Sequence, residues 1–295
     1  MTARDPKHVL VTGTSSGFGL LTVLELLRHG HRVLAGLRGG ELRAEKILPT
    51  LATQDQALLS EARSAGRLTW VDLDVDSPEH RARTLAWIDQ YWSGRLDALV
   101  NNAGYGLLGP SETQSLTDVR AQFETNFFSA VALSQDLLPK LRQTSGALIQ
   151  VSSIVGLYSL PFYGPYSATK HALEAVSEAW WHELEPWGVR VHLIEPGGFK
   201  TEFASQVKWS AGIRSQAEYA QSIGRFQAAH TRKSKNFGGN PQKVVNRIVQ
   251  LIEQPSRKLR HLLGADALLL NVLSRLLPDQ LRLVLVRLIF RSIFR

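Results

Sequence analysis

The stretch Thr12-Gly13-Thr14-Ser15-Ser16-Gly17-Phe18-Gly19 decides the fold, because it joins a short apolar run to a longer amphipathic one. Residues 8–12 before it have the composition of a buried strand, and residues 18–29 have the periodicity of a helix. Its glycines permit a tight turn in which backbone amides and the positive end of the helix face an anion. The loop is therefore predicted to bind the pyrophosphate of a dinucleotide through Gly13, Ser15, Ser16, Gly17, Phe18 and Gly19. A glycine-rich turn without a ligand is the alternative.

Outside this loop, short apolar runs alternate with helical segments along the chain. Strands are predicted over residues 32–35, 68–73, 98–101, 147–152 and 189–195, and helices over 78–92, 115–143, 166–185 and 241–253. Near-continuous apolar strands separated by helices are typical of a parallel sheet that is covered on both faces. We therefore expect an α/β fold with a doubly wound, Rossmann-like parallel sheet whose carboxyl-terminal edge holds the ligands.

Length and composition limit the organisation of the chain. Its 295 residues favour one dinucleotide-binding and catalytic domain over residues 1–295. Within it, residues 198–240 break the alternation and are predicted to form a substrate lid, and residues 265–295 a helical tail of two helices. Cysteine is absent, which excludes disulfides and thiolate zinc sites, and no metal site is predicted. The first residues lack the apolar run of a signal peptide, so a cytoplasmic protein is expected.

The net charge of +8 indicates an anionic partner, such as a cofactor or a membrane surface. No nucleic-acid-binding motif accompanies the charge, so no nucleic-acid partner is expected.

The end of the second predicted strand indicates which dinucleotide binds. Sites that prefer NAD usually carry an acidic residue there, which binds the ribose 2′-hydroxyl. Here the stretch is Val33-Leu34-Ala35-Gly36-Leu37-Arg38, with glycine near the acidic position and arginine two residues later. A guanidinium suits a 2′-phosphate through paired, charge-assisted hydrogen bonds. The sequence predicts NADP(H) in preference to NAD(H), with Arg38 as the selecting residue, and a surface arginine on a loop as the alternative.

A candidate reaction centre follows in the second half of the chain. Tyr166 and Lys170 are four residues apart, and so lie on the same face of a predicted helix. A phenol is a poor base at neutral pH, but a neighbouring ammonium stabilises the phenolate and lowers its pKa. Ser153 follows the preceding strand, where its hydroxyl is placed to bind the substrate oxygen. This combination predicts proton exchange between the phenol and an alcohol or carbonyl.

With these pieces in place, the sequence resembles the short-chain dehydrogenase/reductase family. The matching pieces follow the family's order from Lys7 to Thr201, about two-thirds of the chain. They are the glycine loop 12–19, Asp74-Val75, Asn101-Asn102-Ala103-Gly104, Asn126, Ser153, Tyr166 with Lys170, and Pro196-Gly197 with Thr201. Several independent motifs at compatible separations are far more specific than any one of them.

The resemblance implies a role for each matching residue. Tyr166 is expected to be the general acid in reduction and the general base in oxidation. Lys170 is expected to lower its pKa and hold the nicotinamide ribose, and Ser153 to orient the carbonyl. Asn126 is expected to position a water that links Lys170 to solvent, with stabilisation of a helix bulge as the alternative.

The resemblance also implies the cofactor contacts. The cofactor is expected to contact Asp74 and Val75 at the adenine, Asn102, Ala103 and Gly104 at the ribose, and Pro196, Gly197 and Thr201 at the nicotinamide and phosphates. For Asp74 a turn-forming role is the alternative.

Two further stretches, 102–110 and 156–166, resemble the hydroxysteroid 17β-dehydrogenase and retinol dehydrogenase branch of the family. This implies an oxidoreductase that transfers a hydride between NADP(H) and an apolar alcohol or carbonyl, such as a steroid, retinoid or lipid-derived ketone or aldehyde. Large apolar side chains in the surrounding loops support such a substrate. The candidates are Leu107, Leu108, Leu157, Tyr158, Phe162, Phe203, Trp209 and Phe226. A catalytically silent NAD(P)-binding regulatory protein and an epimerase or dehydratase on the same fold are the alternatives.

The last segment, 281–295, carries arginines at 282, 287, 291 and 295 among apolar residues. Their spacing is close to the helical period, which is typical of a helix that lies in a membrane surface. A helix that packs on its own domain, or on a second subunit in a homodimer, explains the pattern equally well.

Overall fold

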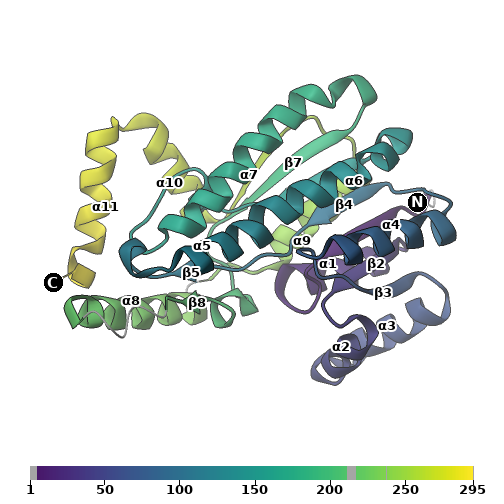
Figure 1. Ribbon diagram of the computed structural model, residues 1–295, viewed down its shortest axis with the longest axis horizontal. Coiled ribbons are helices and arrows are strands. Elements are labelled where there is room, and N and C mark those ends of the chain that lie inside the picture. The colour runs from purple at the N-terminus through teal and green to yellow at the C-terminus, as the bar shows by residue number, and fades with distance from the viewer. Residues whose placement is uncertain (1–4, 211–216, 237, 295) are drawn as a thin grey trace.

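The computed structural model describes residues 5–210, 217–236 and 238–294. Within them, seven parallel strands form a central sheet in the order β3-β2-β1-β4-β6-β7-β9 (Figure 1). The strands are β1 (His8–Thr12), β2 (Arg32–Leu37), β3 (Leu68–Asp72), β4 (Ala98–Asn101), β6 (Ala147–Val151), β7 (Arg190–Pro196) and β9 (Arg260–Leu263). The direction of winding reverses between β1 and β4, which opens a crevice at their carboxyl ends.

Helices cover both faces of the sheet. One face packs against α1 (Gly17–Arg28), α3 (Thr53–Ser64) and α9 (Gln242–Glu253), and the other against α4 (Pro78–Trp92), α6 (Ser129–Thr144) and α7 (Gly164–Glu183). Because side chains alternate along a strand, Val9 and Val11 enter the first core and Leu10 enters the second. All three are fully buried, which explains why the strand is apolar throughout. The doubly wound prediction is confirmed.

Two elements differ from the sequence-based expectation. Strand β9 was not predicted, because Arg260 and His261 make it polar although His261 is buried. The helix expected over 115–143 is α5 (Leu116–Phe123) followed by a π-helical turn, η3 (Glu124–Phe128), and then α6. The polar stretch around Pro49 forms α2 (Gly40–Ile47), the short turn η1 (Leu48–Thr50) and α3.

The predicted lid, 198–240, lies within the described residues except for 211–216 and 237. It contains the turn η6 (Glu202–Ser205), strand β8 (Lys208–Trp209) and helix α8 (Ala217–Asn236). Strand β8 pairs in parallel with β5 (Leu107–Leu108), so the lid is attached to the loop that follows β4.

The predicted tail forms two helices, α10 (Ala265–Leu276) and α11 (Asp279–Phe294), and Arg295 lies outside the described residues. Figure 1 shows α11 beside the end of α8, away from the sheet, and the two helices are in contact. None of the described helices has the length and apolar character needed to cross a membrane.

Candidate active site

A cleft of about 840 Å³ lies at the carboxyl ends of the strands and contains almost every predicted site residue. The predicted residues that line it are Gly13, Ser15, Ser16, Gly17, Phe18, Arg38, Asp74, Val75, Asn102, Ala103, Gly104, Ser153, Tyr166, Lys170, Pro196, Gly197 and Thr201. Gly19 and Asn126 do not line it. Segments that are far apart in the sequence therefore meet in one cavity.

The glycine loop is packed so closely that side chains are excluded from it. A Cβ on Gly19 would lie 2.2 Å from the carbonyl oxygen of Gly13, and a Cβ on Gly13 would lie 2.8 Å from Cα of Ala103. Gly13 also has a φ of +68°, in the left-handed region. The Asn102 amide donates to the carbonyl oxygens of Thr12 and Gly13, at 2.9 and 3.1 Å. The loop is thus held open in front of the amino terminus of α1, a shape that fits a pyrophosphate.

The adenine end of the cleft carries two exposed arginines. Arg38 follows β2, and Arg43 lies on α2; both line the cleft. Sequence reasoning missed Arg43, although its place just after the Gly39-Gly40 turn was a signal. Asp74 lines the cleft and also accepts a hydrogen bond from the backbone N–H of Asp76 at 3.2 Å. Asp74 therefore forms the turn that was predicted as its alternative role, and it also lines the cleft.

Tyr166 and Lys170 face the cleft from the first turns of α7, which begins at Gly164-Pro165. The Lys170 ammonium donates a 2.8 Å hydrogen bond to the Val151 carbonyl, and its Nζ lies 6.0 Å from the centre of the Tyr166 ring. Burial raises the pKa of Tyr166 to about 12, and a hydrogen bond with Ser153 acts against this rise. Burial lowers the pKa of Lys170 to about 8, opposed by the charge of Glu174. The expected lowering of the phenol pKa is therefore outweighed by burial.

Asn126 lies in the π-helical turn, next to the cleft but behind Gly104. Its Oδ1 accepts the backbone N–H of Tyr105 at 3.0 Å, and its Nδ2 donates to the Tyr105 carbonyl at 2.9 Å and to Thr169 at 3.2 Å. A Cβ on Gly104 would lie 3.0 Å from Oδ1 of Asn126 and 3.9 Å from Nζ of Lys170. The side chain thus ties the loop after β4 to α7, the helix that carries Tyr166 and Lys170.

Comparison with known proteins identifies the family. The family model for short chain dehydrogenases matches residues 7–211. The chain belongs to the short chain dehydrogenase family. It is 34% identical over 275 residues to the uncharacterized oxidoreductase YbbO of Escherichia coli (strain K12), covering 93% of this chain and 91% of that protein. It is 34% identical over 270 residues to human retinol dehydrogenase 8, covering 88% of this chain and 81% of that one.

Solved structures agree. A short-chain dehydrogenase from Streptomyces avermitilis superposes with a TM-score of 0.75 at 28% identity, covering 98% of both chains. ElxO, solved with NADP bound, superposes with a TM-score of 0.67 at 26% identity, covering 88% of this chain and 96% of that one. This short chain dehydrogenase is therefore an NAD(P)-dependent oxidoreductase that acts on CH–OH or C=O groups, and it resembles the retinol dehydrogenase branch.

The substrate end of the dehydrogenase cleft differs in detail from the prediction. Of the eight apolar candidates only Tyr158 and Phe203 line it. The other six pack behind its wall: Leu107, Leu108, Leu157, Phe162, Trp209 and Phe226. The wall instead includes Ile154, Val155, Leu160, Tyr163 and Leu270, which sequence reasoning missed. Periodicity shows that these positions are apolar, but only packing decides which of them face the cavity.

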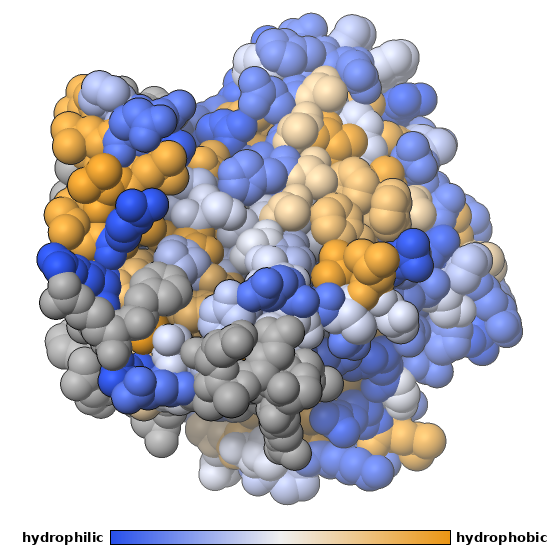
Figure 2. All heavy atoms as spheres, turned by 60° about the vertical axis from the view of Figure 1, so that its left-hand side comes forward, coloured by the Kyte–Doolittle hydropathy of each residue, from blue (hydrophilic) through white to orange (hydrophobic). Residues whose placement is uncertain are grey.

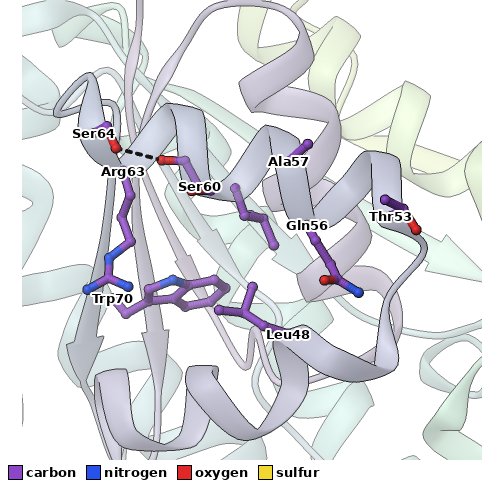
Figure 3. A pocket seen from close by; sticks show the side chains of 9 residues that line it. Leu48, Thr53, Gln56, Ala57, Ser60, Arg63, Ser64 and Trp70 are labelled. Atoms are coloured by element: carbon purple, nitrogen blue, oxygen red, sulfur yellow. Dashed lines mark hydrogen bonds between the residues drawn. The ribbon is translucent and has the colours of Figure 1, made fainter.

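A second cavity, of about 730 Å³, lies between η1, α3 and β3 (Figure 3). Trp70 and Leu48 form its floor, and Arg63 is the one ionisable residue that lines it within the described part of the chain. Arg63 forms an ion pair with Glu41. This cavity therefore lacks a proton donor and acceptor pair, and the chemistry belongs to the larger cleft.

Among the described residues, His29, His31 and Glu253 have the spacing to hold a metal ion, at the opposite edge of the sheet. However, Nδ1 of His31 accepts the backbone N–H of Lys7 at 3.2 Å, so its hydrogen is on Nε2, which faces Glu253 at 3.2 Å. A metal-binding imidazole donates through its second nitrogen instead of accepting there. We therefore assign this group as a hydrogen-bonded ionic cluster.

Proposed function

We propose that this enzyme uses NADP(H) to reduce an apolar ketone or aldehyde. The observation that carries the proposal is that Ser153, Tyr166 and Lys170 form one wall of the cleft whose other end is the glycine loop. A bound nicotinamide cofactor would supply the hydride, and the protein supplies placement and proton transfer.

Each proposed catalytic residue has a defined part. With its pKa raised to about 12, the Tyr166 phenol keeps its proton at neutral pH, so it can donate that proton to a carbonyl oxygen. The hydrogen bond between Ser153 and Tyr166 places both hydroxyls where one substrate oxygen can meet them. The Lys170 ammonium stabilises the phenolate that remains. A phenol that holds its proton is in the protonation state that carbonyl reduction requires.

The proposed preference for NADP(H) depends on the charge at the adenine end. Arg38 and Arg43 are both exposed there, and β2 ends without an acidic residue to bind a ribose 2′-hydroxyl. ElxO was solved with NADP bound, and its similarity to this chain supports NADP(H) as the cofactor here.

The end of the cleft far from the glycine loop is apolar, so we propose an apolar substrate. Val155, Tyr158, Leu160, Phe203 and Leu270 line it, and the last two come from the segments expected to be lid and tail. The similarity to retinol dehydrogenase 8 supports an extended apolar carbonyl or alcohol as the substrate class. We propose that residues 198–240 act as the substrate lid within one domain.

We further propose that the tail lies against an anionic membrane surface. Phe290 and Ile293 pack against the core beside the cleft, so one face of α11 is occupied by the protein. Leu281, Leu283, Val284, Leu288 and Ile289 on the same helix are exposed, next to the exposed Arg287 and Arg291. Figure 2 shows hydrophobic side chains gathered beside hydrophilic ones on this side of the molecule. An apolar face flanked by arginines matches an anionic lipid surface.

The experiment that tests the proposed function is a screen of NADPH consumption with a panel of apolar ketones and aldehydes. We expect turnover with at least one extended apolar carbonyl and little with small polar ones. Isomerisation or dehydration without net consumption of NADPH would instead support the epimerase or dehydratase alternative.

A further inference from the structure

A buried ionic cluster lies directly beneath the proposed catalytic groups. Glu174 on α7 is 4% exposed and Glu195 on β7 is 0% exposed. Arg260, from β9, donates through Nη1 to a carboxylate oxygen of Glu174 and, at 2.9 Å, to Oε1 of Glu195. Its Nη2 donates at 2.7 Å to Glu178, whose side chain is 56% exposed. The cluster therefore joins α7 to two strands of the sheet.

Its members are adjacent to the segments that carry the active site. Glu174 follows Lys170 by one helical turn, and Glu195 directly precedes Pro196-Gly197, which line the cleft. A Cβ on Gly156 would lie 3.0 Å from Cγ of Glu174 and 2.9 Å from Oγ of Ser152. The Glu174 side chain is thus packed against the turn that begins at Ser153.

The charges in this cluster determine how it is held together. Oε1 of Glu174 and Oε2 of Glu195 are buried, and neither has a hydrogen-bond donor among the described residues. Burial raises the pKa of both carboxyls, because only one guanidinium compensates them. Each carboxyl therefore holds a proton more tightly than an exposed carboxyl does, and the two compete for the single guanidinium of Arg260. A buried group of this kind is costly to break, since removing one member leaves another unpaired.

We propose that the Glu174–Arg260–Glu195 cluster is a positioning device, which fixes α7, and with it Tyr166 and Lys170, relative to the Ser153 turn and the end of β7. The inference rests on the proposed catalytic roles of these residues. Proton transfer depends on sub-ångström placement, and a misplacement of about 1 Å can lower the rate by about a hundredfold. The carboxyl groups act through Lys170 and Tyr166 and do not touch the substrate.

The test compares Glu174→Ala with Glu178→Ala, a matched control that removes the exposed partner of the same arginine. We expect kcat for NADPH-dependent reduction to fall at least about tenfold in Glu174→Ala, with a smaller change in the dissociation constant for NADPH. Glu178→Ala should stay within about threefold of the natural enzyme. A folded Glu174→Ala enzyme that keeps its kcat, or an equal loss in both variants, overturns the proposal.

A second variant separates positioning from simple destabilisation. Glu174→Gln keeps the shape of the side chain and a hydrogen bond to Glu195 but removes its charge, so we expect kcat at neutral pH to be largely rescued. The charged groups that face Lys170 are Glu174 on its own helix and, through Glu174, Arg260 and Glu195 from β9 and β7. Because the Glu174 charge raises the pKa of Lys170, the basic limb of the kcat profile should move to lower pH in Glu174→Gln. An unshifted profile overturns the proposal even if Glu174→Ala does not fold.

Tyr166→Phe distinguishes this inference from the proposed function. If Tyr166→Phe abolishes turnover but the Glu174 variants behave like the natural enzyme, only the positioning role fails. If Tyr166→Phe remains active, the proposed catalytic assignment itself fails.

Discussion

At the scale of single residues, the proposed catalysis depends on transfer of the phenol proton of Tyr166. Removing that hydroxyl in Tyr166→Phe should lower kcat by about a thousandfold, the usual contribution of a general acid. NADPH binding should persist, because the glycine loop and the arginines are untouched. The comparison is Tyr163→Phe, which removes a second, half-buried phenol of the same cleft, hydrogen-bonded to His230 at 3.1 Å. Equal losses in the two variants would contradict a specific role for Tyr166.

The proposed preference for NADP(H) is also expected to depend on a single residue. Arg38→Ala should reduce the ratio of kcat/KM with NADPH to that with NADH by about tenfold or more, since a 2′-phosphate loses charge-assisted hydrogen bonds. Arg32→Ala is the control, because Arg32 is an exposed arginine at the other end of the same strand. Steady-state kinetics with both cofactors measures the ratio. If Arg38→Ala leaves it unchanged, Arg43 is the next candidate.

At the scale of secondary-structure elements, the turn from β1 to α1 has no room for a side chain at Gly13 or Gly19. Gly19→Ala would place a Cβ 2.2 Å from the Gly13 carbonyl oxygen and 2.6 Å from Nδ2 of Asn102. We expect NADPH binding to be weakened by at least about a hundredfold, because the pyrophosphate loop must change shape. Gly224→Ala, on α8, is the control, since its Cβ would meet no atom within 4 Å. NADPH fluorescence titration compares the variants.

The tail helix α11 gives a second element-scale prediction. A double substitution, Val284→Glu with Leu288→Glu, places acidic groups on its exposed face and leaves Phe290 and Ile293 packed. Sedimentation with vesicles that contain phosphatidylserine should show at least about a tenfold loss of binding, and the natural protein should bind them less at high salt. Leu116→Glu, at another exposed leucine, is the control. Unchanged vesicle binding excludes the membrane role, and a monomer produced from a dimer would assign this face to a second subunit.

At the scale of the whole molecule, the stability of the fold should depend on pH through two buried histidines. Burial lowers the pKa of His192 on β7 to about 4 and that of His261 on β9 to about 3, from 6.5. Arg247 donates to Nδ1 of His261 at 3.1 Å, so protonation of that nitrogen would break the bond. Below pH 6.5 the unfolded chain binds more protons than the folded one. Stability is therefore complete above pH 6.5 and is lost as the pH falls toward 4.

Urea unfolding at several pH values measures this effect. The two imidazoles alone would lower the free energy of unfolding by roughly 2 kcal/mol per pH unit below pH 6, and the net fall should be smaller. The Glu174–Glu195 pair acts in the opposite sense and reduces the net fall, because burial raises the pKa of both carboxyls in the folded state. His261→Gln should flatten the acid side of the curve. A profile in this variant as steep as that of the natural protein would show that other groups control acid unfolding.

Much of the fold follows from patterns within short stretches of the sequence. The apolar run of β1, the glycines of the loop and the four-residue spacing of Tyr166 and Lys170 each follow from rules that act over a few residues, so the sequence was sufficient to predict them. The same holds for Arg38, because the length of the apolar run before it was sufficient to place it at the end of a strand. Strand β9 is different. Arg260 and His261 are polar, and they form a strand because they pair in parallel with β7 at the edge of the sheet.

Tertiary structure decided everything that depends on which side chains meet. Phe226 and Val155 are both apolar, yet only Val155 faces the cleft, because packing with Phe162 draws Phe226 into the core. No pattern in the sequence brings Glu174, Glu195 and Arg260 together, since they lie on three elements separated by up to 86 positions. The sequence by itself determined most of the chain's elements and the residues on which the catalytic proposal depends. The folded chain alone determined burial, and burial sets the pKa of Tyr166 and Lys170 because it removes water from charged groups.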